Sequence, residues 1–163
     1  MYVVVKGGEL SSERPDGVVG QVRMVTGAVN VVTYSTSPGT HRMMNVGSDG
    51  VHLVGVELLP TSRRFTPSSR AAVPPYELVL DQDRVRAWHL VLAPGASSSA
   101  IAQTAPGLRV TVVGGVLLET ANGGSAQRRE LRPGDIAWQP PGTTRALVNV
   151  GTSRVELVEL ELR

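Results

Sequence analysis

The chain contains no cysteine, and this absence excludes several kinds of chemistry at once. Disulfide bonds, thiolate metal sites and cysteine nucleophiles all need a thiol, so none of them is available. Histidine is also scarce, because His41, His52 and His89 are the only three. The sequence therefore holds few of the imidazoles on which metal sites and acid–base catalysts are commonly built.

Long apolar runs are missing as well. No stretch approaches the length of a membrane-spanning helix, and the start "MYVVVKGGEL" lacks the basic leader and the cleavage site of a signal peptide. We therefore expect a cytoplasmic protein with no membrane partner. Its 163 residues, of which 41% are hydrophobic, are enough for one domain or two very small ones.

Lysine is nearly absent, because Lys6 is the only lysine among the 16 basic residues. Arginine keeps its proton to very high pH, so a formal charge of only +2 goes together with a pI of about 9.5. The arginines are scattered along the chain and aromatic residues make up only 4% of it. A nucleic-acid surface usually needs a basic stripe with stacking aromatic side chains, so we expect no nucleic-acid partner.

What the sequence has in abundance is short β-strand signals. Segments rich in valine and leucine, such as "YVVVK", "VHLVGVELL" and "VELVELEL", are separated by Gly, Pro, Asn or Asp. No stretch combines a helical period with caps at both ends. The spacing predicts an all-β sandwich or barrel. Residues 60–77 differ, because they are rich in Pro, Ser and Arg and predict a linker or an extended crossing strap.

The sequence also repeats itself. Residues 45–58, "NVGSDGVHLVGVEL", align with residues 149–162, "NVGTSRVELVELEL", and eight of the fourteen positions are identical. Upstream, "SPGTHR" parallels "PPGTTR", and "VVVKGGEL" parallels "VTVVGGVL". The two halves of the chain are therefore expected to be copies of one β module.

The copies differ in length. We predict a partial module over residues 1–59, a linker over 60–75 and a complete module over 76–163. Residues 76–107, expected to form three strands, have no counterpart before Met1. Bare strand edges invite aggregation, so we expect the missing strands to be replaced in some way. A second chain could supply them, or the first copy could pack its exposed sheet on the second module. A third alternative is that the true start of the protein lies upstream. A homodimer, with or without strand exchange, is the expected assembly.

The complete module resembles the cupin family. The second cupin motif has a glycine, five residues, P-x-G, two residues, a histidine, three residues and an asparagine. Here Gly134 is followed at the same spacing by "PPG" ending at Gly142, by Arg145 and by Asn149, so only the histidine is changed. Pro141 and Gly142 suit a tight type II turn, and Gly134 follows a proline in another such turn.

The first cupin motif is matched by spacing alone. Counting from Gly95, the two histidine positions hold Ile101 and Gln103, the glutamate position holds Leu108, and Gly115 closes the motif. The resemblance implies an all-β cupin-type double-stranded β-helix (an RmlC-like jelly-roll barrel). One module is complete and one is partial, in a bicupin-like arrangement.

The same resemblance bears on metals, because typical cupins hold iron, manganese, nickel or zinc through three histidines and one glutamate. Ile101 and Leu108 offer no donor atom, Gln103 is a poor ligand, and the permanent cation of Arg145 would repel a metal. We therefore predict no metal and no other cofactor in the complete module.

Arg145 is the most informative residue. Side chains alternate along a strand, so Arg145, Leu147 and Asn149 share one face, and in the cupin frame Arg145 points into the barrel. A charge in an apolar cavity is costly unless it is paired. Three arrangements resolve this: an internal acid, an anionic ligand held by the guanidinium, or a side chain that reaches the barrel mouth.

These considerations favour a metal-free protein that binds a small organic molecule, with a carboxylate, a sugar derivative or a metabolite with an aromatic ring as candidates. Arg145 and Gln103 are the predicted polar groups of the pocket. Ile101, Leu108 and Trp138 are its predicted walls. The alternatives are a metal-free isomerase, epimerase or cyclase, and a degenerate module kept for dimeric assembly or regulation.

The enzyme hypothesis needs an acid or base inside the cavity, and only His89 and Tyr76 are near candidates. His52 is expected to face solvent. His41 occupies the histidine position of the first copy, as a surviving ligand or as a relic bonded to a backbone carbonyl. The second interpretation is favoured, because the segment that would supply its partner ligands has no counterpart in that copy.

Overall fold

The structure, a computed structural model, describes residues 1–32, 39–59, 63–70 and 75–163. These residues form strands and loops, in agreement with the all-β prediction. They divide into two compact units, Met1–Glu57 and Leu58–Arg163. Of the predicted linker, residues 60–62 and 71–74 lie outside the described residues, and residues 63–70 belong to the second unit. The described part of the chain holds no helix long and apolar enough to cross a membrane.

The described residues of the second unit form strands β7 to β15. Their bounds are β7 Tyr76–Gln82, β8 Val85–Leu92, β9 Ile101–Gln103, β10 Gly107–Val113, β11 Gly115–Ala121, β12 Gln127–Leu131, β13 Ile136–Gln139, β14 Thr143–Asn149 and β15 Val155–Leu162. The segment 76–107, predicted to hold three strands, contains β7, β8 and β9. Short Val- and Leu-rich runs bounded by turn residues account for most of these strands.

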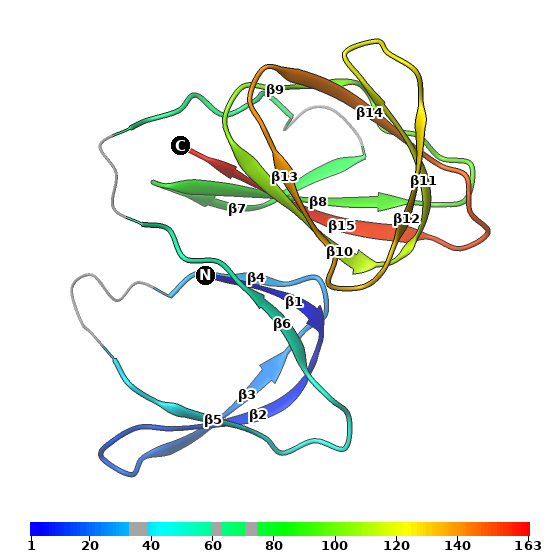
Figure 1. Ribbon diagram of the computed structural model, residues 1–163. Helices are drawn as coiled ribbons and strands as arrows, with labels where there is room; N and C mark the ends of the chain where they lie inside the picture. The colour runs from blue at the N-terminus through cyan, green and yellow to red at the C-terminus, as the bar shows by residue number, and fades with distance from the viewer. Residues whose placement is uncertain (33–38, 60–62, 71–74) are drawn as a thin grey trace. The chain divides into compact units, whose positions relative to one another are not determined.

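Two antiparallel sheets build the second unit, with strand orders β13-β10-β15-β8-β7 and β12-β11-β14-β9. Figure 1 shows the sheets curling around a common interior to form a barrel. The last strand, β15, pairs with β10 on one side and with β8 on the other, so its neighbours come from distant parts of the sequence. These crossovers mark a jelly-roll topology rather than a simple meander.

The interior of this barrel is apolar at one end and charged at the other. Alternate residues of β15 face inward: Val155 and Leu157 enter the apolar core, and Glu159 and Glu161 follow on the same face. The core consists of Tyr76, Trp88, Leu90, Leu92, Ile101, Leu117, Leu147, Val155 and Leu157. Each large apolar side chain buried there contributes about 1.5–3 kcal/mol to folding.

Both predicted turns have the expected glycine conformation. Gly134 has a φ of 90° and Gly142 a φ of 80°, values that a side chain would strain. The Gly142 amide donates to the Gln103 carbonyl over 2.8 Å. This turn therefore starts β14 beside β9 and sets the register that brings Arg145 opposite Ile101.

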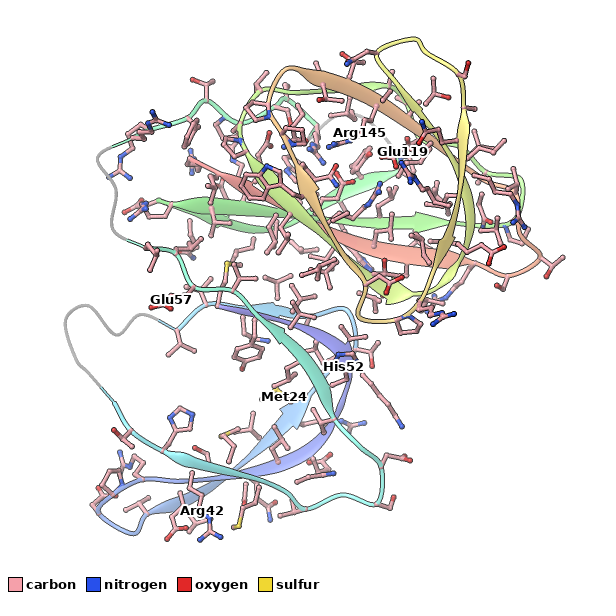
Figure 2. All side chains as sticks on the ribbon, in the orientation of Figure 1. Met24, Arg42, His52, Glu57, Glu119 and Arg145 are labelled. Carbon is pink, nitrogen blue, oxygen red and sulfur yellow. The ribbon has the colours of Figure 1, made fainter. Side chains whose placement is uncertain are left out.

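The first unit has six strands in its described residues. Their bounds are β1 Tyr2–Lys6, β2 Gly8–Glu13, β3 Val19–Met24, β4 Val29–Asn30, β5 Arg42–Asn45 and β6 His52–Gly55. They form two three-stranded sheets, β4-β1-β6 and β3-β2-β5. The core between them is small and consists of Val4, Leu10 and Met24, the last of which is labelled in Figure 2.

The strand order of the first unit recurs in the second. The order β4-β1-β6 corresponds to β13-β10-β15, and β3-β2-β5 corresponds to β12-β11-β14. In the second unit each of these sheets continues, with β8 beside β15 and β9 beside β14. Among the described residues of the first unit no strand takes either place, so β5 and β6 have one paired edge each.

The first glycine of the pair in "VVVKGGEL" and in "VTVVGGVL" is required for the same steric reason in both units. A Cβ on Gly7 would lie 2.2 Å from the Met24 carbonyl oxygen, and one on Gly114 would lie 2.3 Å from that of Leu131. No side chain tolerates such contacts with backbone. At each of these glycines the chain passes from one sheet to the other and lies against the end of a neighbouring strand, with room only for glycine.

The asparagines of the two "NVG" segments also repeat a hydrogen-bond pattern. Asn45 accepts the Gly47 amide through Oδ1 over 3.1 Å and donates to the Asp49 carbonyl over 2.7 Å. Asn149 accepts from Gly151 over 3.0 Å and donates to Ser153 over 2.8 Å. The side chain thus holds the loop that joins two strands of different sheets.

Candidate functional site

A cavity of about 670 Å³ opens at the charged end of the second barrel. Its wall comes from both sheets, because Arg109 of β10, Glu119 of β11 and Arg145 of β14 all line it, and Arg129 of β12 reaches it as well. The remaining lining residues are Ala121, Gly124, Ser125, Gln127, Leu131, Ala137, Trp138, Gln139 and Thr143. The cavity therefore combines a cluster of charges with apolar surface.

Three guanidinium groups surround the carboxylate of Glu119. Arg109 donates to it through both Nη atoms, each over 3.3 Å, in a parallel fork. Arg129 Nε lies 3.6 Å from Oε2 and Arg145 Nε lies 3.9 Å from Oε1. The Glu119 carboxylate thus lies near three cations, but only Arg109 donates hydrogen bonds to it.

Arg145 points into the barrel, with 12% of its side chain exposed (Figure 2). Its Nη2 donates to Gln103 Oε1 over 3.1 Å, and this is its one hydrogen bond to another side chain among the described residues. Burial lowers the pKa of the Arg145 guanidinium, opposed first by the attraction of Glu159. The group is therefore a desolvated cation that is hydrogen-bonded to one neutral amide and attracted by two carboxylates, Glu159 and Glu119, to which it makes no hydrogen bond.

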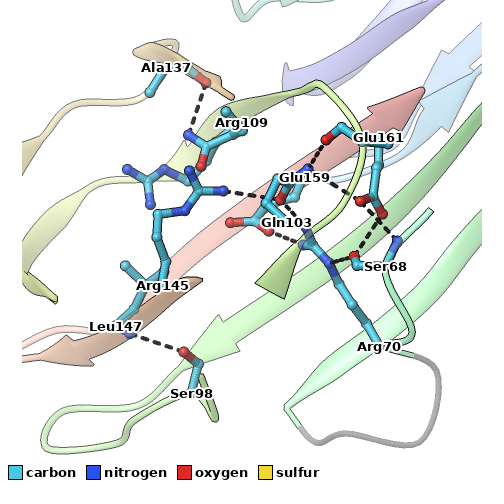
Figure 3. Close-up of polar contacts among 12 residues, drawn as sticks. Ser68, Arg70, Ser98, Gln103, Arg109, Ala137, Arg145, Leu147, Glu159 and Glu161 are labelled. Carbon is cyan, nitrogen blue, oxygen red and sulfur yellow. Dashed lines mark hydrogen bonds and ion pairs between the residues drawn. The ribbon is translucent and has the colours of Figure 1, made fainter. Parts of the chain in front are cut away.

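Gln103 connects Arg145 to a second buried arginine (Figure 3). Arg70 donates to the same Gln103 Oε1 over 2.5 Å and forms an ion pair with Glu159. The Gln103 amide nitrogen donates in turn to the Ala105 carbonyl over 2.7 Å, which fixes the orientation of the side chain. The amide oxygen is thus held between two cations.

The segment that carries Arg70 was expected to be a linker or a strap, and two of its described residues, Ser68 and Arg70, are buried in the barrel. Ser68 donates to Glu161 through its amide over 3.0 Å and through its hydroxyl over 2.8 Å. Arg70 is 1% exposed, and its Cζ lies 5.3 Å from the Tyr76 ring centroid and 6.0 Å from that of Trp88. This segment fills the inner end of the charged region.

Three of the five predicted site residues come together. Arg145 and Gln103 are hydrogen-bonded, and Ile101 lies opposite Arg145 in the β9–β14 register, buried in the apolar core. Trp138 lines the cavity, although 61% of it is exposed, so it borders a solvent-accessible edge.

Leu108 does not line the cavity. The structure places its neighbour Arg109 there instead, opposite Glu159 in the β10–β15 register. The cupin frame counts to Leu108, but the alternation of side chains along β10 turns Arg109 inward.

Sequence reasoning missed most of the charged side chains of the site. Glu119, Glu159 and Glu161 are the internal acids that it could not place, and Arg70 lies in a stretch without strand alternation. A usable signal was present in "VELVELEL", because the inward parity that buries Val155 and Leu157 also directs both glutamates inward. The strap gives no such signal, since its position follows only from contacts with distant strands.

The residues at the four cupin ligand positions do not fit a metal ion. Ile101 and Leu108 lack donor atoms, Gln103 Oε1 already accepts from two guanidiniums, and Arg145 is a cation. Among the described residues no group of three His, Cys, Asp or Glu side chains is placed to hold a metal.

None of the three histidines is among the residues that line the cavity. His41 and His52 are exposed in the first unit, and the solvent-facing position of His52 agrees with the prediction. His89 Nε2 lies 2.9 Å from Glu156 Oε1, on the face of the sheet opposite the charged cluster. Tyr76 does lie inside the barrel, and burial raises the pKa of its phenol, which therefore stays protonated at neutral pH.

The strand topology and the two-sheet barrel give the second unit the fold of a cupin-type double-stranded β-helix (a jelly-roll barrel), which confirms the predicted fold class. No family model and no curated protein matches the chain.

Several solved structures resemble it. AerE from Microcystis aeruginosa is similar over 99% of this chain and 76% of its own, with 14% identity and a TM-score of 0.62. A cupin domain from Bordetella pertussis Tohama I covers 63% of this chain and 99% of its own, with 20% identity and a TM-score of 0.48. An RmlC-like cupin family protein with a double-stranded β-helix fold from Methanocaldococcus jannaschii covers 62% and 90%, with 14% identity and a TM-score of 0.48. At these identities the likeness concerns the fold alone.

Proposed function

We propose that the second unit binds a small organic anion inside its barrel, without a metal ion, and that Arg145 is the main anchor for the anionic group. The observation that carries this proposal is the state of Arg145. Its guanidinium lies on the wall of a cavity, is 12% exposed, and has one side-chain hydrogen bond, to the neutral Gln103. A buried cation in this state costs free energy that an anionic ligand would recover.

The alternatives for Arg145 fit the geometry less well. Glu119 is the nearest internal acid, but it is engaged by the fork of Arg109 and lies 3.9 Å from Arg145 Nε. At this distance and an effective dielectric constant of about 20, an ion pair contributes roughly 4 kcal/mol of attraction, and repulsion from the nearby Arg109 and Arg70 offsets part of it. The side chain also does not escape to water, because it is mostly buried. Most of its hydrogen-bonding capacity is left for a ligand.

The cavity has the size and the mixed character of a small-molecule site. Its volume of about 670 Å³ lies within the usual range of 300–1,000 Å³ for such sites. Ala121, Leu131, Ala137 and Trp138 supply apolar surface beside the charged cluster. We therefore expect a ligand with an apolar or ring-shaped part and at least one acidic group.

A thermal-shift screen of carboxylic acids and sugar phosphates tests the proposal, because a ligand that binds only the folded protein raises its Tm. Arg145→Ala should abolish the shift caused by any anionic hit, since the anchor is lost. His41→Ala, the change at the equivalent position of the first copy, is the matched control and should leave the shift intact. A shift that survives Arg145→Ala would show that the anchor is assigned wrongly.

The absence of a metal is tested separately. Elemental analysis of the purified protein should find far less than one transition metal ion per chain, and chelator treatment should leave both the Tm and ligand binding unchanged. About one tightly held metal per chain would contradict this part of the proposal. The residues at the four ligand positions support the expected result, because two of them have no donor atom.

A metal-free isomerase, epimerase or cyclase is the second candidate function. The specific observation in its favour is Glu119, a carboxylate that lines the cavity and is 13% exposed. Such a group can exchange a proton with a bound ligand if it lies within hydrogen-bonding reach. Hydrogen–deuterium exchange at an acidic C–H of a bound ligand, lost in Glu119→Gln while binding persists, would establish this function. Binding without exchange would favour a binding protein.

A dimer is the third element of the proposal. In the described residues β6 pairs only with β1, whereas the corresponding β15 has two partners. An open strand edge is a ready template for pairing with another chain. We therefore expect light scattering to give twice the monomer mass of 17.2 kDa. A stable folded monomer would rule out strand exchange and leave the proposed ligand site unaffected.

A further inference from the structure

The interior of the first unit is apolar and partly uncovered. Leu53 of β6 and Met43 of β5 are 36% and 40% exposed. The residues at the corresponding positions of the second unit, Leu157 and Leu147, are 0% and 2% exposed and belong to its core. There β8 lies beside β15 and β9 beside β14, and no strand takes either place among the described residues of the first unit. Apolar side chains left open in this way indicate a protein-binding surface.

The backbone of β6 is also unpaired along this edge. Successive residues of an antiparallel strand direct their N–H and C=O groups to opposite sides. The Val56 amide donates to the Met1 carbonyl over 2.9 Å, on the β1 side, and Val54 shares this direction. Leu53 and Gly55 therefore direct their backbone groups to the open side, where the described part of the chain holds no strand.

The second unit shows what such an edge accepts. After β15, Arg163 donates to the Arg84 carbonyl beside β8, whereas Leu162 donates to the Pro106 carbonyl beside β10, so alternate residues serve the two neighbouring strands. β8 pairs antiparallel with β15 along residues 155–162. The edge that β6 leaves open thus corresponds to an edge that carries an antiparallel strand in the other copy of the module.

From these observations we infer that the β6 strands of two chains pair antiparallel about a two-fold axis at Val54, so that a second copy of this chain covers the open side of the first unit. This inference rests on the dimer of the proposed function and specifies its interface. Leu53 of each chain lies opposite Gly55 of the partner subunit, and Val54 lies opposite its own copy. All the open backbone groups of both residues then find partners.

The register follows from the direction of the backbone groups. An antiparallel ladder joins residues whose N–H and C=O groups face each other, so Leu53 pairs with either Leu53 or Gly55 of the partner subunit. Within β6, only the register centred on Val54 pairs both open residues of both chains. The rotation also keeps the two Leu53 side chains on the same face of the joined sheet, where each covers the interior of the first unit.

The charge of β6 favours its own copy as the partner. Its sequence "HLVG" contains no Asp, Glu, Lys or Arg, so self-pairing brings no like charges together. By contrast, the edge strand β12 carries Arg128, Arg129 and Glu130, and charged side chains of this kind protect an edge from pairing. The two sheets of the first unit have corresponding strand orders, so β5 is open on the same side as β6 and is covered by the same rotation.

Cross-linking tests the position of the axis, and the absence of native cysteine leaves an introduced thiol only its own copy as a partner. At the axis the two Val54 Cα atoms lie about 4.5 Å apart, within disulfide range. His52 is on the same face of β6, but its two copies lie roughly 13 Å apart along the strands. After mild oxidation, Val54→Cys should give at least about 5-fold more cross-linked dimer than the control His52→Cys, read by non-reducing electrophoresis.

A pair of charge substitutions tests the same interface without a cross-link. Val54→Lys places two ammonium groups opposite each other, so the dimer Kd from analytical ultracentrifugation should rise by about 5-fold or more at low salt. Added salt should reduce this effect, because it screens the repulsion. Val46→Lys adds the same charge to the same unit at a residue that is 54% exposed and lies outside the strands. This control should change the Kd by less than about 2-fold.

The outcomes separate this interface from the proposed function. A dimer in which His52→Cys cross-links as well as Val54→Cys would overturn the interface and leave the dimer itself standing. Equal weakening by Val46→Lys and Val54→Lys would do the same, because the effect would then come from the total charge. A chain that stays monomeric at every concentration would overturn both the interface and the dimer. None of these results affects the anion site, which Arg145→Ala tests by itself.

Discussion

The two units of this protein share one strand-pairing frame and differ in what the frame encloses. In the second unit, Arg109 lies opposite Glu159 in the register and Glu119 opposite Leu147. In the first unit the same register positions bring together Tyr2 with Gly55 and Ser12 with Met43. The position of Arg145 corresponds to the exposed His41. The charged cluster of the second unit therefore has no equivalent in the first.

This difference shows that the frame and the site depend on different residues. The glycine pairs and the motif asparagines occur in both copies, because the close sheet contact and the inter-sheet loop are needed wherever this β module folds. The buried charges occur only where the barrel is closed by additional strands and by the strap. A cluster of arginines and glutamates gains strong, specific interactions only when water is excluded around it. The comparison can be tested by changing one copy at a time.

The largest effect is expected from the strap, which only the second unit contains. Arg70→Ala leaves Glu159 buried without its partner, and breaking a buried ion pair typically costs about 3–5 kcal/mol. We expect a loss of about 4 kcal/mol in the free energy of unfolding, measured by urea denaturation. The double variant Arg70→Met with Glu159→Leu should recover most of it, since no charge is left unpaired. A loss below 1 kcal/mol in Arg70→Ala would mean that the strap is not part of the barrel.

The glycine pairs should give the next largest effect, and a similar one in both units. Gly114→Ala and Gly7→Ala each force a methyl group against a backbone carbonyl, so we expect each to destabilise its unit by about 3 kcal/mol. Gly20→Ala, at a strand position with open space around it, is the control and should change stability by less than about 0.5 kcal/mol. Hydrogen exchange would locate the loss in one unit. Equal tolerance of all three substitutions would contradict the close contact.

The motif asparagines should separate the two copies. Asn149 is fully buried and makes a third hydrogen bond, to the Leu92 carbonyl of β8 over 2.9 Å, whereas Asn45 is exposed and makes two. Asn149→Ala leaves buried backbone groups unpaired and should cost about 3 kcal/mol, against about 1 kcal/mol for Asn45→Ala. Thermal denaturation monitored separately for each unit measures both losses. Equal losses would mean that the first unit encloses its asparagine as the second does.

The smallest effect should have the opposite sign. Arg145→Met removes a desolvated cation and leaves its neighbours satisfied, because Gln103 still accepts from Arg70 and Glu119 still accepts from Arg109. We expect the ligand-free protein to gain about 1 kcal/mol of stability while it loses anion binding, a common exchange at binding sites. His41→Met in the first copy should change stability by less than about 0.5 kcal/mol. A clear loss of stability in Arg145→Met would indicate a structural role for this arginine.

Local patterns were enough to predict a large part of this protein. The turn at Pro141–Gly142, the inward direction of Arg145 and its contact with Gln103 all follow from motif spacing and strand alternation. The same reasoning predicted Leu108 at the site, where the structure has Arg109. The family spacing pointed to residue 108, but the alternation of side chains along β10 directs residue 109 into the barrel. An error of one residue exchanges the two faces of a strand, and here it exchanged a leucine for a cation.

The sequence by itself determined the β class, the repeated module, the turns and the loss of the cupin metal ligands, because each depends on residue type and on spacing within a few residues. Only the tertiary structure decided which charges meet. Glu119, Arg129 and Arg145 come from three strands, and Arg70 comes from a strap without any periodic pattern. Their association depends on how the sheets pair and close.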